Sequence, residues 1–239
     1  MQLLVSVRDA GEAREAMAAG ADILDAKEPA LGTLAPVSPA ALASIAAVLA
    51  PGAQLSVALG EPADVDALAV SLAARTDALG GRPTFLKFVP PTLAAGTVAA
   101  MVATVRRAAP GARVIVASYA DRQTVEAFTA LAHVAADAGA DGVLLDTADK
   151  GASLLERWSS RDIEGFVATA HSRGILVALA GSLALEDLPR LAALGADVAG
   201  VRGAACEGGR AGRLSAARVT RLVQTARAPL PRGPATPVS

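Results

Sequence analysis

The stretch DAGADGVLLD (residues 137–146) joins the end of a helical pattern, through Gly-Ala-Asp, to a short apolar run. Two further stretches repeat it, AAGADILD (18–25) and ALGADVAGVRG (193–203). A glycine after an amphipathic stretch is typical of a helix end, and a short apolar run of this kind is typical of a buried parallel strand. The repeats therefore predict a chain built from successive helix-to-strand units.

The same alternation of apolar runs and Ala-rich amphipathic stretches covers the rest of the chain, with a period of about thirty residues. We expect strands at Leu3–Val7, Asp22–Ala26, Gln54–Leu59, Thr84–Phe88, Arg113–Ser118, Gly142–Asp146, Ile175–Ala180 and Val198–Arg202. We expect helices at 10–19, 39–49, 63–75, 93–109, 121–138, 161–173, 185–194 and 214–227. Eight strand–helix units in 239 residues predict an α/β fold, a single (β/α)8 TIM barrel with eight parallel strands.

A doubly wound open sheet is the alternative fold. It would carry a Gly-rich phosphate-binding turn after the first strand, and VRDAG (7–11) lacks that fingerprint. We therefore expect one catalytic barrel domain over residues 1–227. The remaining residues, 228–239, include Pro229, Pro231, Pro234 and Pro237 and are predicted to be a disordered tail.

Composition excludes several classes of function. The 22 basic and 23 acidic residues give a net charge of −1, which argues against a nucleic-acid partner. One cysteine and two histidines make a zinc site improbable, so we expect no metal and no other cofactor. Mean hydropathy is +0.43, yet the uncharged segments 29–60 and 88–105 are broken by Pro and Gly, so we expect no membrane partner. No secretion signal is recognisable, which predicts a cytoplasmic location.

Lysine is rare in this chain. Of the 22 basic residues only three are lysines, Lys27, Lys87 and Lys150, and the others are arginines. Arginine supplies a surface cation equally well but cannot form a Schiff base. Lysines kept against this bias therefore indicate a need for the amine itself.

Lys27 lies just past the second predicted strand, Lys87 at the end of the fourth and Lys150 four residues past the sixth, all at the carboxyl end of the barrel where active sites are built. Asp25 and Asp146 lie on two of the same strands. Neighbouring ammonium groups and burial lower the pKa of an amine, and carboxylates carry protons. We therefore predict a catalytic cluster; structural salt bridges at the barrel rim are the alternative. Its members are Lys27, Lys87, Asp25, Asp146 and Lys150.

Barrel enzymes often bind phosphate through the loops after strands seven and eight. Both predicted loops begin with glycine and small residues, which let backbone amides approach an anion. Ordinary strand-to-helix turns, which also use glycine, are the alternative. The predicted substrate phosphate site comprises Gly181, Ser182, Arg202, Gly203 and Ala204.

Other candidates are weaker. The stretch EGGRAG (207–212) is predicted to be a mobile loop and a candidate lid. Both histidines, His133 and His171, are interpreted as structural, and Cys206 has no histidine nearby in the sequence to activate it. Tyr119 follows strand five, within reach of the site. The residues alone thus indicate a Schiff-base lyase or aldolase that acts on a phosphorylated carbonyl compound.

The chain also resembles a known family, the (5-formylfuran-3-yl)methyl phosphate synthases, also called 4-(hydroxymethyl)-2-furancarboxaldehyde-phosphate synthases. The resemblance spans about residues 1–227 and includes the unusual phrase DAKEPALGTLAP (25–36). It continues through FLKF (85–88), LLDTADKGASLLE (144–156), ALAGSL (178–183) and GVRGAACEGGRAGRLS (200–215).

The resemblance implies a TIM barrel that condenses two glyceraldehyde 3-phosphate molecules into a phosphorylated furan, with loss of phosphate and water, for methanofuran-type cofactors. It implies that Lys27 forms the Schiff base and that Lys87, Lys150, Asp25 and Asp146 assist. Three alternatives remain: a Schiff-base aldolase of the deoxyribose-phosphate type, an isomerase that uses no imine, and a non-catalytic phosphosugar-binding barrel. The expected partner is a small phosphorylated triose, and apolar helix faces leave a homo-oligomer open.

Overall fold

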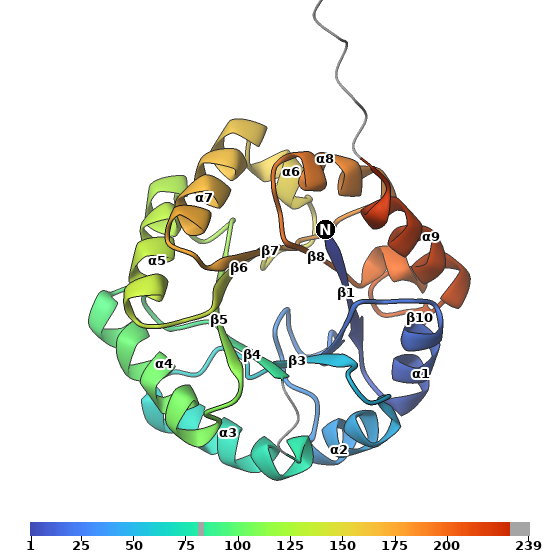
Figure 1. Ribbon diagram of the computed structural model, residues 1–239, viewed down its shortest axis with the longest axis horizontal. Coiled ribbons are helices and arrows are strands. Elements are labelled where there is room, and N and C mark those ends of the chain that lie inside the picture. The colour runs from blue at the N-terminus through green and yellow to red at the C-terminus, as the bar shows by residue number, and fades with distance from the viewer. Residues whose placement is uncertain (81–83, 230–239) are drawn as a thin grey trace, which may run out of the picture.

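The computed structural model describes residues 1–80 and 84–229. Eight parallel strands form a closed barrel in chain order, and helices surround it as a ring (Figure 1). This confirms the predicted TIM barrel. The strands are β1 (Gln2–Val7), β2 (Ile23–Ala26), β3 (Gln54–Ala58), β4 (Thr84–Phe88), β5 (Arg113–Tyr119), β6 (Gly142–Asp146), β7 (Leu176–Leu179) and β8 (Val198–Val201).

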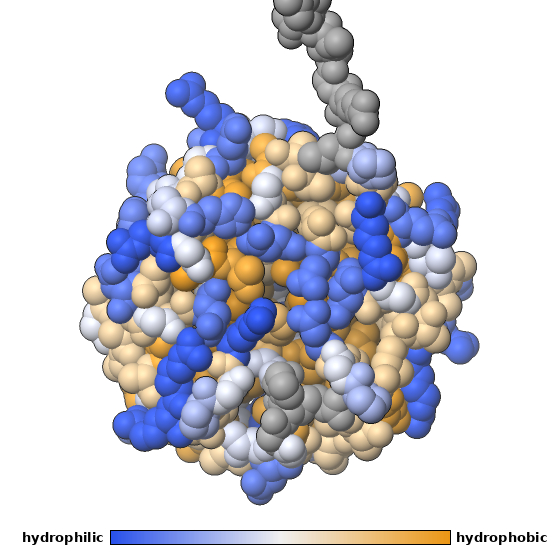
Figure 2. All heavy atoms as spheres, in the orientation of Figure 1, coloured by the Kyte–Doolittle hydropathy of each residue, from blue (hydrophilic) through white to orange (hydrophobic). Residues whose placement is uncertain are grey.

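Amphipathic helices connect the strands and pack their apolar faces on the barrel. They are α1 (Ala10–Ala18), α2 (Pro39–Val48), α3 (Val65–Leu79), α4 (Ala95–Ala108), α5 (Val125–Asp137), α6 (Leu154–Arg157), α7 (Ser160–Ser172), α8 (Leu188–Ala193) and α9 (Ala216–Arg227), with 3-10 turns η1 (Leu185–Asp187) and η2 (Gly203–Ala205). Hydrophilic side chains lie scattered among apolar atoms on the face seen in Figure 2.

The helix boundaries differ from the prediction at several places, by up to four residues. The helix expected from residue 121 begins at Val125, because Thr124 is its N-cap and accepts a hydrogen bond from Ala127 N. This leaves the Asp121 carboxylate free to bond another loop. The short helix α6, capped by Ser153, was not predicted, since four residues are too few to show a periodic pattern.

Alternation along the strands separates two apolar cores. On β2, Leu24 and Ala26 face the helices, whereas Ile23 packs inside the barrel. Lys27, two positions beyond Asp25, stays in register because its backbone N donates to Val7 O at 3.2 Å. The inward-facing positions along β2 and just beyond it are therefore apolar at Ile23 and polar at Asp25 and Lys27, toward the carboxyl end of the strand.

The stretch predicted to be a mobile loop is the turn of a hairpin. β9 (Cys206–Glu207) pairs antiparallel with β10 (Arg213–Leu214). A Cβ on Gly212 would lie 1.7 Å from Glu207 O, so only glycine fits where the two strands approach. The Gly-rich composition therefore serves a tight hairpin here.

Within the described residues, no helix is both long enough and apolar enough to cross a membrane. Of the predicted C-terminal tail, residues 230–239 lie outside the described part of the chain.

Candidate active site

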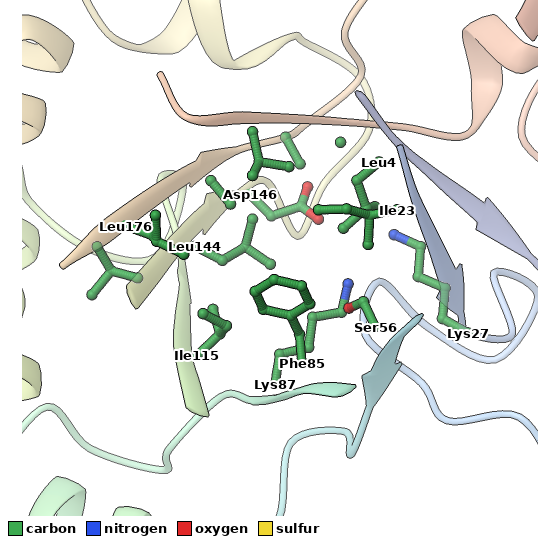
Figure 3. Close-up of a pocket in the computed structure, with 15 residues that line it drawn as sticks. Leu4, Ile23, Lys27, Ser56, Phe85, Lys87, Ile115, Leu144, Asp146 and Leu176 are labelled. Carbon is green, nitrogen blue, oxygen red and sulfur yellow. The ribbon is translucent and has the colours of Figure 1, made fainter. Parts of the chain in front are cut away.

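The five predicted catalytic residues meet at the carboxyl end of the barrel, on β2, β4 and β6 and the loops after them. Figure 3 shows the ammonium groups of Lys27 and Lys87 and the carboxylate of Asp146 pointing toward one central space. Four of the five are buried, and Lys150 is partly exposed; the buried four are Lys27, Lys87, Asp25 and Asp146. Residues distant in sequence are thus held as one group.

Asp25 is the fixed anion of the cluster. Its side chain is fully buried, with Oδ1 2.7 Å from Lys87 Nζ and Oδ2 3.9 Å from Lys27 Nζ. Ser6 Oγ donates to Oδ2 at 3.2 Å. Asp25 therefore forms a close ion pair with Lys87 and a much weaker one with Lys27.

The Lys27 amine is buried among charged groups. Burial lowers its pKa to about 8, Asp25 and Asp146 oppose this, and the positive charges of Lys87 and Lys150 reinforce it. At pH 7 about one Lys27 side chain in ten is then neutral, against about one in 3,000 for an ordinary lysine. The position thus supplies a nucleophilic amine at neutral pH.

Asp146 and Lys150 form the second ion pair. Lys150 Nζ donates to Asp146 Oδ1 at 2.8 Å and also to the backbone oxygen of Thr147. Burial alone would raise the pKa of Asp146, but the ammonium groups of Lys150 and Lys27 and the hydrogen bond from Thr147 N lower it. Asp146 is therefore an ionised acceptor facing Lys27.

Asp121 holds the loop that carries Lys150, a role that the sequence did not reveal. Its two carboxylate oxygens accept hydrogen bonds from Ala148 N and Asp149 N, both at 2.7 Å. Thr33, from the loop after β2, also donates to Ala148 O at 3.3 Å. These contacts fix the loop backbone and hence the position of Lys150 relative to Asp146.

Two connected spaces lie at the cluster. The inner one, about 40 Å³, is lined mostly by apolar side chains such as Phe85, Ile115 and Leu144, together with Lys27 and Lys87. The outer one, about 400 Å³, has several charged side chains in its lining, among them Lys150 and Arg210. Lys27 and Asp146 line both spaces. A small substrate in the outer space therefore contacts the amine of Lys27, whose side chain is buried.

Four of the five predicted phosphate-site residues form a compact wall of the outer cavity: Gly181, Ser182, Gly203 and Ala204. Ser182 has a φ of 50°, which is unusual for a residue with a side chain. Its Oγ donates to Lys150 O at 3.3 Å and thereby ties the loop after β7 to the loop after β6. Their role in phosphate binding stays a prediction.

Arg202 is different, and the structure corrects its assignment. Although it lines the cavity, all five of its N–H groups already have protein acceptors. Two bonds go to the Glu12 carboxylate, at 2.6 and 2.9 Å, and three go to the backbone oxygens of Ser6, Arg210 and Gly212. Arg202 therefore has no donor left for a phosphate.

Replacing Gly181 with alanine should destabilise the protein by about 1–3 kcal/mol. Its φ is 112°, and a Cβ there would lie 2.8 Å from Thr147 Cγ2. Urea unfolding measures the change. Gly165→Ala, in α7 with open space around the added methyl, is the matched control and should be neutral or stabilising. Equal stability of the two variants would contradict the crowding seen here.

Arg210 is the basic residue that sequence reasoning missed. It lines the outer cavity together with Lys27, Asp146 and Lys150, and its Nη2 donates to Gly32 O at 2.7 Å. Arg210 lies in the stretch predicted to be a mobile loop, and the residues around it contain no motif that would place it at the site.

The remaining candidates lie outside the cluster. His171 pairs with Asp197 at 2.9 Å on the outside of the barrel, and His133 is exposed on α5. Burial raises the pKa of the Cys206 thiol, which disfavours a thiolate. Tyr119 is buried and donates to Glu61 Oε1 at 2.7 Å, while burial and this bond raise its pKa.

The model of the 4-HFC-P synthase family matches residues 3–223. The chain belongs to this family. The (5-formylfuran-3-yl)methyl phosphate synthase of Methanococcus maripaludis is 35% identical over 240 residues, which cover 95% of this chain and 100% of that one. The synthase of the same name from Methanocaldococcus jannaschii is 37% identical over 217 residues, covering 87% of this chain and 92% of that one. The resemblance noted in the sequence is thereby confirmed, and this member of the 4-HFC-P synthase family is an enzyme.

Solved structures similar to this 4-HFC-P synthase family member are also barrels. A deoxyribose phosphate aldolase from Aeropyrum pernix aligns with a TM-score of 0.65 and 18% identity, covering 93% of this chain and 87% of that one. A 3-hexulose-6-phosphate synthase aligns with a TM-score of 0.60 and 17% identity, covering 94% and 99%. At these identities the likeness concerns the fold.

Proposed function

We propose that this enzyme condenses two molecules of glyceraldehyde 3-phosphate, through a Schiff base on Lys27, into (5-formylfuran-3-yl)methyl phosphate. The observation that carries the proposal is the buried amine of Lys27, with a pKa of about 8, between the ion-paired Lys87 and Lys150. The product is the compound in the names of the relatives. It would supply the furan of methanofuran-type cofactors.

The carbon skeleton of that product dictates which bond forms. A furan with a formyl group and a phosphorylated methyl group on alternate carbons has a branched skeleton. It arises when C3 of one triose attacks the carbonyl C2 of the ketose isomer of the other. The first triose loses its C3 phosphate, and ring closure with two dehydrations completes the furan. The atoms balance as two triose phosphates giving the product, one phosphate and two waters.

Lys27 is suited to the first stage of this sequence. Its neutral amine adds to the aldehyde of one triose phosphate and expels water, which gives an imine. The imine acidifies C2, and removal of the C2 proton leads to expulsion of the C3 phosphate. C3 then becomes the nucleophilic carbon of an enol and attacks the ketose carbonyl. Hydrolysis of the imine at the end returns the Lys27 amine.

The two ion pairs are suited to the proton transfers. Asp146 is an ionised carboxylate that faces Lys27, and Lys150 is bonded to it at 2.8 Å, so the pair holds a base and an acid together. Lys87 on β4, 2.7 Å from Asp25 on β2, supplies a second acid. Gly181, Ser182, Gly203 and Ala204 offer backbone amides to a phosphate.

Reductive trapping tests the imine. Borohydride added with glyceraldehyde 3-phosphate should leave a mass adduct on Lys27, found by peptide mass spectrometry, and no adduct on Lys27→Arg. The initial trapping rate should rise about tenfold per pH unit below pH 8 and level off above it, because the neutral amine fraction does so. An adduct on another lysine, or a rate still rising at pH 10, would exclude the proposed role.

A further inference from the structure

The outer cavity has an excess of positive charge. Apart from Arg202, whose charge Glu12 neutralises, the cations that line the two spaces are Lys27, Lys87, Lys150 and Arg210; they face Asp146 in the lining and Asp25, which pairs with Lys87 behind it. Three of the cations already stand in carboxylate pairs, of which the Lys27 pair is the longest at 3.9 Å. The fourth, Arg210, has no carboxylate within ion-pair distance among residues 1–80 and 84–229.

The hairpin places Arg210 by its backbone. Arg202 Nε donates to Arg210 O at 3.2 Å, and Arg202 Nη2 donates to Gly212 O at 3.0 Å. Arg202 is itself held by the buried carboxylate of Glu12 on α1. The positive charge of Arg202 is thus neutralised, and its hydrogen bonds fix the turn from which Arg210 extends.

The Arg210 side chain reaches across the cavity mouth from this turn to the loop after β2, where it bonds Gly32 O. Within the described chain that is the side chain's one hydrogen bond, so four of its five N–H groups remain for a ligand. Burial lowers the pKa of Arg210 and the nearby Asp146 carboxylate opposes this, although arginine stays charged. A partly desolvated guanidinium with spare donors, facing a cavity, is the arrangement that recognises a phosphate.

We propose that Arg210, from the hairpin between β8 and α9, binds a phosphate group of the substrate in the outer cavity, which Gly181, Ser182, Gly203 and Ala204 also line. The ligand class is a phosphate monoester dianion, which the planar guanidinium contacts through two parallel N–H bonds. This inference rests on the proposed function, because it takes the substrate to be phosphorylated. It makes Arg210 a specificity-determining residue and Arg202 the residue that positions it.

Binding of inorganic phosphate tests the proposal without any turnover. Isothermal titration of the wild-type enzyme with phosphate, at constant ionic strength, should give saturable binding that Arg210→Met weakens about 10- to 100-fold. Arg210→Lys should fall between the two. The matched control is Arg213→Met, an exposed arginine three residues along the same hairpin, which should change the affinity less than about twofold.

Two further measurements separate this proposal from the proposed function. With Arg210→Met, the KM for glyceraldehyde 3-phosphate should rise by a similar factor, while borohydride trapping of Lys27 by unphosphorylated glyceraldehyde should not change. Arg210-dependent phosphate binding in an enzyme that forms no furan would sustain the phosphate site and overturn the furan synthase. Normal furan synthesis by Arg210→Met, with KM and phosphate affinity both unchanged, would sustain the furan synthase and overturn the phosphate site at Arg210.

Two other outcomes also decide the matter. A wild-type enzyme that does not bind phosphate at tens of millimolar overturns the role of Arg210. If Arg210→Met unfolds at room temperature, Arg210→Lys carries the test, because it keeps the charge and loses the paired donors. An Arg210→Lys variant with unchanged phosphate affinity and an unchanged KM would then count against the proposal.

Discussion

Lys27→Arg should abolish furan formation, with kcat reduced at least about 1,000-fold. The substitution keeps a positive charge beside Asp25 and Asp146, so the electrostatic balance of the cluster is retained. Arginine, however, is never neutral near pH 7 and cannot form an imine. The loss would therefore report the covalent step itself rather than a lost charge.

The assay follows furan absorbance with glyceraldehyde 3-phosphate as substrate. Thermal unfolding and phosphate titration of the variant serve as controls, and both should stay close to the wild type, because Lys27 is not proposed to hold the phosphate. Substantial activity of Lys27→Arg would point to enediol chemistry without an imine, as in a barrel isomerase, and would remove the Schiff base from the mechanism.

Glu12→Ala should destabilise the protein by about 3–5 kcal/mol, the largest effect on stability that we expect from one substitution. Glu12 and Arg202 are 7% and 4% exposed and are joined by two hydrogen bonds. Arg8 shares the same carboxylate at 2.8 Å. Removal of Glu12 leaves the buried Arg202 charge without a counterion, and that desolvated charge is what destabilises the fold.

Urea unfolding gives the free energy of unfolding for each variant. Glu164→Ala, at an exposed position on α7, is the control and should change it by less than about 0.5 kcal/mol. The double variant Glu12→Met/Arg202→Met should recover much of the loss, since no charge is then left buried. A loss below about 1 kcal/mol for Glu12→Ala would show that solvent reaches Arg202 and that the pair is not a buried anchor.

The barrel and the lysine cluster were predictable from the sequence because both follow from local patterns. Each strand is a short apolar run, and parallel strands in a barrel all end on the same side. Lys27, Lys87 and Lys150 each lie at the end of such a run or shortly after it, so their convergence needs no knowledge of long-range packing. The same rule placed Asp25 and Asp146 beside them.

The parts that the sequence did not reveal depend on contacts between distant segments. Arg202 stands where a phosphate ligand is expected, and only the fold shows that Glu12, 190 residues earlier, takes its donors. Arg210 was hidden in a Gly-rich stretch whose composition also suits a mobile loop. Asp121 was placed at the start of a predicted helix, whereas Thr124 caps that helix and Asp121 bonds the Lys150 loop.

Closure of the barrel also governs when the neutral amine of Lys27 arises during synthesis of the chain. Lys27 emerges from the ribosome early, but the pKa of its amine falls only when the completed barrel encloses it. The barrel is completed by β8, and Arg202, which directly follows β8, is the residue that Glu12 holds. Until then Lys27 is an ordinary protonated lysine, inert toward the sugar aldehydes of the cell. Nascent chains are thereby spared premature modification at the amine that is proposed to react.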